Sequence, residues 1–156
     1  MSGFGPVLLR LAVGTVFMSQ GLLKLMPVSG GGVADTAALF ASLGFPSPSA
    51  VAMTLGWVEL AGGATLLLGA HTGWTSFALV LTTTVSAWTL HPPNALFMTW
   101  SPPRDQRLGF ELDVVLVGAL LCLMVTGAGS LSVDRARQRA VEREAAGLAR
   151  LRRKSV

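Results

Sequence analysis

The chain has 156 residues, enough for one domain, and its composition is not that of an ordinary soluble protein. Hydrophobic residues make up 51% of it and charged residues only 13%, whereas soluble domains carry about 25% charged residues. Eight of the twelve lysines and arginines fall in the last 22 residues, so the basic isoelectric point belongs to the tail and does not indicate a nucleic-acid-binding fold. The single cysteine, Cys122, excludes an internal disulfide or a dithiol redox pair, and we expect it to pack as a small apolar residue.

Four apolar stretches are long enough to cross a bilayer as helices, which takes about 20 residues. They lie at Val7–Met26, Ala50–Gly69, Gly73–Leu90 and Gly109–Ala128. The pattern predicts an all-α fold, an integral membrane four-helix bundle over residues 1–130, followed by a basic tail over residues 131–156. Several glycines would allow these helices to approach closely. They are Gly14, Gly21, Gly56, Gly62, Gly63 and Gly118.

The connection between the first two stretches contains a further candidate helix. Residues 35–43 predict a short helix at the membrane interface, with an irregular loop as the alternative. Asp35 is the expected N-cap, and Leu39, Phe40 and Leu43 would form its apolar side.

The C-terminal tail has apolar residues at helical spacing under an arginine-rich face over residues 132–154, which predicts a basic C-terminal helix. Four spans put both termini on the same side, and that side holds nine of the twelve basic residues. The positive-inside rule therefore predicts an inner-membrane protein with both termini in the cytoplasm. The tail would either lie on anionic lipid headgroups or bind a cytoplasmic partner.

Glu59 is the most informative residue, because it stands in the middle of the second apolar stretch. An ionisable side chain at that depth costs roughly 2.5–3.5 kcal/mol, so it faces protein or a wet cavity rather than lipid. At a rise of about 1.5 Å per residue, Glu59 lies about 13 Å below the outer edge, Gln20 about 9 Å and Lys24 about 3 Å. Gln20 is therefore the expected partner of Glu59. Lys24 is expected to pair with Glu111 or Asp113, which begin the fourth stretch.

These depths predict a polar pocket in the outer half of the bundle. Its candidate members are Gln20, Lys24, Glu59, Glu111, Asp113 and His91. The alternative is structural: buried polar groups that fix helix pairing, and acidic side chains at a helix N-terminus. His91 is either a proton carrier in this pocket or a surface residue. It lies a whole span away from His71, so the two histidines cannot share a metal or a haem. No nucleophilic triad or metal-ligand spacing is present, so we assign no catalytic residue and no metal site.

A series of short motifs runs through residues 7–135. They include Leu9-Arg10-Leu11, Gln20-Gly21, Lys24-Leu25, Leu43-Gly44-Phe45-Pro46, Val58-Glu59-Leu60, Gly62-Gly63, Leu68-Gly69, Phe110-Glu111, Gly127-Ala128-Gly129, Ser132 and Asp134. In this order they resemble the DoxX family of small integral membrane proteins. The resemblance implies four membrane helices and an association with membrane redox systems, including quinone-linked thiosulfate oxidation and oxidative-stress complexes. It makes Arg10, Lys24, Glu59 and Glu111 the characteristic polar positions. One departure is Ser19-Gln20, where many members have a histidine before the glycine.

Three functions are compatible with these features. The first is an accessory subunit of a quinone-linked membrane redox complex, with no cofactor of its own other than a quinone held in the outer pocket. The second is a purely structural or assembly subunit of a larger membrane complex. The third is a small transporter or lipid-handling protein, since intramembrane carboxylates also mark substrate paths. The expected partners are the lipid bilayer, anionic headgroups at the tail and other membrane protein subunits, but not nucleic acid.

Overall fold

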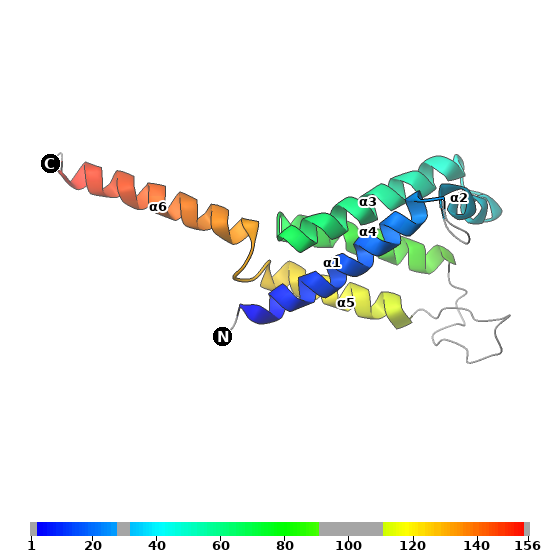
Figure 1. Cartoon of the computed structure of the whole chain (residues 1–156), viewed down its shortest axis with the longest axis horizontal. Helices are drawn as coiled ribbons and strands as arrows, with labels where there is room; N and C mark the ends of the chain where they lie inside the picture. Colours follow the sequence, from blue (N-terminus) through cyan, green and yellow to red (C-terminus); the bar gives the residue numbers. More distant parts are fainter. Residues whose placement is uncertain (1–2, 28–31, 91–110, 155–156) are drawn as a thin grey trace.

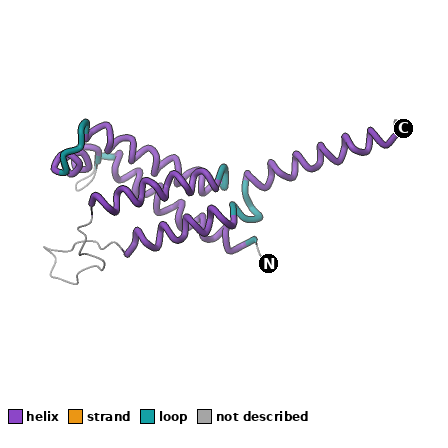
Figure 2. The backbone as a smooth tube through the Cα atoms, turned by 180° about the vertical axis from the view of Figure 1, so that it is seen from behind, coloured by secondary structure: helices purple, strands orange, loops and turns teal. Residues whose placement is uncertain are grey.

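The computed structural model describes residues 3–27, 32–90 and 111–154, and all regular secondary structure within these ranges is helical. Its six helices are α1 (Phe4–Leu25), α2 (Val33–Ser42), α3 (Pro48–Leu68), α4 (Thr72–Leu90), α5 (Glu111–Thr126) and α6 (Val133–Lys154). Helices α1, α3, α4 and α5 lie side by side and form what we call the helical core (Figures 1 and 2). Helix α2 packs at one end of this core, and α6 extends away from the other end (Figure 1). We refer to them as the α2 end and the α6 end.

The helical core agrees closely with the apolar stretches of the sequence. Within the core, α1 contacts α3 and α5, while α4 contacts α3 and α5. Its centre is apolar, with buried side chains from all four helices. They are Val13, Phe17, Leu66, Leu79, Leu116, Leu120 and Leu123. In the described part of the chain, α1 and α3 are long and apolar enough to cross a membrane. Helix α4 is continuous but contains threonines and serines that lower its hydropathy, and α5 has 16 described residues.

Glycines bring the backbones of α1 and α3 into direct contact. A Cβ atom added at Gly21 would lie 2.4 Å from the backbone nitrogen of Leu60, and one at Gly63 would lie 2.4 Å from that of Met18. An added Cβ at Gly14 would lie 3.0 Å from the Gly63 carbonyl oxygen, one at Gly56 would meet the Leu25 side chain, and one at Gly62 would meet Leu79 of α4. Small residues that permit such approach are typical of helix pairs in membranes.

The prediction for Gly118 is wrong, because an added Cβ there meets no atom within 4 Å. The prediction for Cys122 is wrong as well. This residue lies on the exposed face of α5, since the adjacent Leu123 occupies the position that points into the core.

Helix α2 confirms the short helix expected after the first span, but its details differ. Gly32, with φ at 97°, stands at the N-cap position that was expected for Asp35. Asp35 lies in the first turn, where a carboxylate is still favoured by the helix dipole. Helix α2 packs on α3 through Ala37 and Phe40. Leu39 and Leu43 are exposed, so only part of the expected apolar side is buried.

Candidate functional site

A buried ion pair joins α1 to α3 near the α2 end. The Lys24 ammonium lies 2.5 Å from both carboxylate oxygens of Glu59. Only 3% of the Glu59 side chain is exposed, against 22% of the Lys24 side chain. Among the described residues, this is the one salt bridge. The Glu59 carboxylate is thus enclosed by protein, whereas the Lys24 ammonium is the partly exposed member of the pair.

The structure corrects the expected partner of Glu59, which is Lys24 and not Gln20. Gln20 is half-buried and forms no hydrogen bond to Glu59 within the described ranges. The physical reason is side-chain direction, because every side chain on a helix leans toward the helix N-terminus. Helices α1 and α3 run in opposite directions, so Lys24 and Glu59 lean toward each other. The long aliphatic stem of the Lys24 side chain then spans the difference in depth between the two residues that was expected from the sequence.

The other predicted members of the pocket are brought together only in part. Asp113, in the first turn of α5, is half-buried and close enough to Glu59 for their like charges to interact. Glu111 is exposed at the start of the same helix. The predicted pairing of Lys24 with Glu111 or Asp113 is therefore wrong, because Lys24 forms its salt bridge with Glu59. His91 lies outside the described residues. The polar group near the α2 end therefore consists of Lys24, Glu59 and the nearby Asp113.

A second polar group, at the α6 end, holds α6 against the turn between α3 and α4. The Asp134 carboxylate accepts hydrogen bonds from the backbone nitrogens of His71 (2.8 Å) and Thr72 (3.0 Å) and from the Thr72 hydroxyl (3.2 Å). These donors form the free N-terminus of α4, so Asp134 acts as an N-cap supplied by a distant helix. The backbone nitrogen of Asp134 donates a hydrogen bond to the carbonyl of Gly69 (3.1 Å), the C-cap residue of α3.

Arg10 lies buried under this turn. Its guanidinium donates a hydrogen bond to the carbonyl of Leu131 and interacts electrostatically with Asp134. Gly69 has φ at 66°, and any Cβ there would collide with the Arg10 guanidinium. Glycine is thus required at position 69 both by backbone conformation and by space. We call Arg10, Gly69, Thr72, Leu131 and Asp134 the α6-end cluster.

The environment of Asp134 favours its charged form. Burial raises the pKa of the carboxyl, but the hydrogen bonds from Thr72 and His71, together with the electrostatic interaction with His71, outweigh that effect. The pKa of Asp134 therefore lies below its ordinary value.

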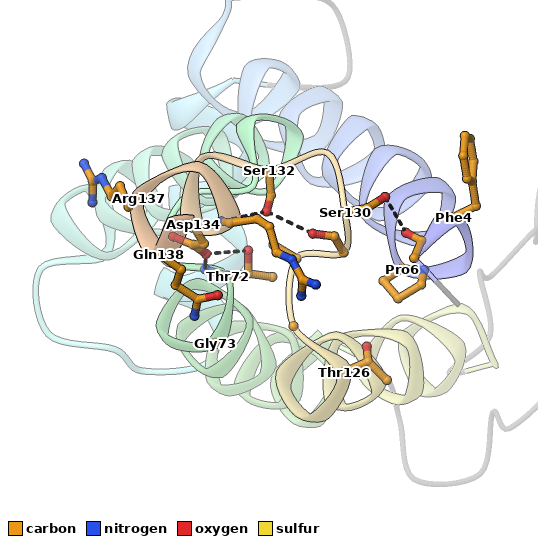
Figure 3. A pocket seen from close by; sticks show the side chains of 15 residues that line it. Phe4, Pro6, Thr72, Gly73, Thr126, Ser130, Ser132, Asp134, Arg137 and Gln138 are labelled. Atoms are coloured by element: carbon orange, nitrogen blue, oxygen red, sulfur yellow. Dashed lines mark hydrogen bonds between the residues drawn. The ribbon is translucent and has the colours of Figure 1, made fainter. Parts of the chain in front are cut away.

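A cavity of about 810 Å³ opens beside this cluster. Its walls come from the start of α1, the first turn of α4, the segment after α5 and the first turn of α6. Figure 3 shows Asp134 hydrogen-bonded to Thr72 on one side of the cavity, Thr126 at its base and Phe4 on the opposite side. Arg135 and Arg137 also line it, and Arg137 Nη1 lies 3.4 Å from Nε2 of His71.

In the sequence, Arg10 and Asp134 stand out only as positions of the family motifs, and nothing there predicts that they interact. They are 124 positions apart, and no local pattern links them. One available signal was Asp134 itself, an acidic residue one position into a helix that follows a glycine-rich segment.

Comparison with known proteins places the chain in a family. The DoxX family model matches residues 5–92. The inner membrane protein YphA of Escherichia coli (strain K12) is 31% identical over 133 residues, which cover 83% of this chain and 90% of that protein. No solved structure matches the chain. The chain belongs to the DoxX family of membrane proteins, which confirms the resemblance found in its motifs.

Proposed function

We propose that this chain is an accessory subunit of a quinone-linked redox complex in the inner membrane, and that Lys24 and Glu59 form its working site. The helical core would cross the membrane as a four-helix bundle, with the α2 end outside and the α6 end in the cytoplasm. Membership of the DoxX family and the inner-membrane location of the YphA relative support the membrane placement. The concentration of arginines in α6 supports its direction.

The observation that carries the proposal is the buried Lys24–Glu59 pair. The ammonium can donate a hydrogen bond to the carbonyl oxygen of a quinone, and it is the exposed member of the pair. The carboxylate can accept a proton released by quinol oxidation, and the protonated carboxyl can supply one for quinone reduction. In this proposal the electrons pass through the cofactors of the partner complex, and this subunit contributes the headgroup contact and the proton.

Replacing Glu59 by Gln tests the proposal, because it keeps the size of the side chain and removes its charge. We expect quinone-dependent turnover of the complex to be lost in membranes while the amount of assembled complex, measured on native gels, stays normal. Glu142→Gln is a matched control that removes the same charge from the exposed surface of α6. Normal turnover in the Glu59→Gln complex would contradict the proposal.

The second candidate function is a structural or assembly subunit without chemistry of its own. It is favoured by the position of the ion pair beside the glycine contact between α1 and α3, where the pair would fix helix register. In that case Glu59→Gln should lose assembly together with turnover. Replacing both residues, as Lys24→Met with Glu59→Leu, should then restore both, because no unpaired charge remains. A working site would not recover in this double variant.

A transporter or lipid-handling role is the third candidate. Its support is the intramembrane carboxylate itself, since such groups mark substrate paths. Transport of labelled substrates or lipids by the purified protein in proteoliposomes would distinguish it from the first two.

A further inference from the structure

We propose that the cavity at the α6 end, together with the adjoining groove between α4 and α5, binds one anionic glycerophospholipid. The headgroup phosphate would occupy the cavity beside Arg135 and Arg137, and an acyl chain would lie in the groove. This inference rests on the transmembrane placement proposed above and is independent of any quinone chemistry.

The first argument is the charge of the cavity. The Asp134 carboxylate, its one acidic lining group, already accepts three hydrogen bonds from the start of α4 and interacts electrostatically with Arg10. Arg135 and Arg137 are exposed and form no salt bridge with any described residue. The cavity therefore presents two uncompensated guanidinium groups, the donors that bind phosphate best.

The second argument is the apolar groove that continues from the cavity. It has a volume of about 320 Å³ and is lined by Gly73, Trp74 and Phe77 of α4 and Met124 of α5. Gly73 lines both spaces. From there the groove runs one helical turn along α4, away from α6 and toward the middle of the core. A polar, basic chamber joined at one residue to an apolar groove matches the shape of a lipid and not that of a free phosphate ester.

The third argument is location. In the proposed topology, the cavity lies at the cytoplasmic boundary of the membrane, where anionic lipid headgroups stand. The exposed Trp74 ring lies at the same level and suits an interfacial position. This site refines the expected contact between the tail and anionic lipid, because it assigns that contact to the first turn of α6. The rest of α6 extends away from the core (Figure 2).

Lipid retention on the purified full-length protein tests the site. The protein in non-ionic detergent is incubated with dioleoyl phosphatidylglycerol or dioleoyl phosphatidylcholine, and bound lipid is counted by native mass spectrometry. We expect one tightly held phosphatidylglycerol and no comparable phosphatidylcholine. Arg135→Gln with Arg137→Gln should weaken phosphatidylglycerol binding about 30-fold, at about fivefold for each basic residue near the headgroup. The matched control is Arg139→Gln with Arg143→Gln, which removes the same charge from α6 outside the cavity and should leave binding unchanged.

The groove is tested by filling it. An added Cβ at Gly73 meets no atom within 4 Å, so a larger side chain has room to start there, and Gly73→Leu is designed to place its side chain at the junction of cavity and groove. We expect it to abolish lipid retention, whereas Gly118→Leu, equally free of contacts on α5, should not. Equal losses in the two arginine pairs, or retention unaffected by Gly73→Leu, would overturn the proposal. Displacement of the lipid by equimolar glycerol phosphate would also overturn it, because it would indicate a site for a soluble phosphate ester.

Discussion

At the scale of single residues, the chain places charged side chains where water is scarce and pairs them. Lys24 and Glu59 form a salt bridge, whereas Arg10 donates a hydrogen bond to the Leu131 carbonyl and interacts only electrostatically with Asp134. A buried ion pair contributes little net stability, since desolvation offsets the attraction, but removing one member leaves a buried charge without compensation. Single and double substitutions at Lys24 and Glu59 should therefore behave very differently.

The first prediction concerns Lys24 and Glu59. Lys24→Met should destabilise the protein by about 3–5 kcal/mol, because the buried Glu59 carboxyl then lacks its partner. Lys24→Met combined with Glu59→Leu should recover most of that loss. Unfolding in mild detergent, followed by tryptophan fluorescence, measures both. A double variant as unstable as Lys24→Met alone would show that the pair contributes more than charge compensation.

The second prediction concerns the pH dependence of the Asp134 cap. Asp134→Ala should cost about 1 kcal/mol at neutral pH, as the loss of a helix N-cap does. The pKa of Asp134 is lowered in the folded state, so its stabilisation is fully present above the unfolded-state pKa of about 3.9. It is lost as the pH falls through the lower folded-state pKa. The difference in unfolding temperature between the native chain and Asp134→Ala should hold from pH 7 to about pH 5 and shrink below about pH 4.

Glu142→Ala, at an exposed position on α6, is the control for this measurement. It should change the unfolding temperature little across the same range. A difference for Asp134→Ala that instead grows on acidification would contradict the capping role.

At the scale of helices, α1 and α3 share the most extensive contact between described helices, and glycines allow their backbones to approach. The two backbones approach at Gly21 and Gly63, and the Lys24–Glu59 pair lies next to this contact. The glycines and the ion pair are therefore parts of one helix–helix interface, so a change in one should alter the geometry of the other.

The third prediction follows from this interface. Gly21→Ala and Gly63→Ala should each destabilise the protein by about 1–3 kcal/mol, because the added methyl group meets backbone atoms. Gly118→Ala should have the opposite sign and stabilise α5 by about 0.5–1 kcal/mol, since its methyl group has open space and alanine favours a helix. Detergent unfolding of the three variants measures the effects, and equal signs at all three positions would contradict the packing.

At the scale of the whole molecule, the polar groups are divided between the two ends of an apolar core. The Lys24–Glu59 pair lies toward the α2 end, and the α6-end cluster, its cavity and the basic helix lie at the other. In the proposed topology one end faces the outside and the other the cytoplasm. The two sites then act in different leaflets, so substitutions at one should leave ligand binding at the other unchanged.

The fourth prediction concerns orientation. A fluorescent protein fused after Val156 should be bright, and alkaline phosphatase fused there should be inactive, because both report a cytoplasmic end. Alkaline phosphatase fused after Leu90, three spans along the chain, should be active. An active phosphatase at the C-terminus would reverse the proposed topology.

The sequence alone determined the membrane class, the family, the helical content and the enclosure of Glu59 by protein. These follow from local features: apolar runs of helical length, a single acidic residue within one of them, and short motifs in a fixed order. It did not determine which residues meet. The partner of Glu59 depends on the direction in which side chains lean from two antiparallel helices, and Asp134 reaches Thr72 across 62 positions of chain. Only the tertiary structure decided those contacts, and with them the cavity at the α6 end, because helix register and packing distance are properties of the folded core and not of any one segment.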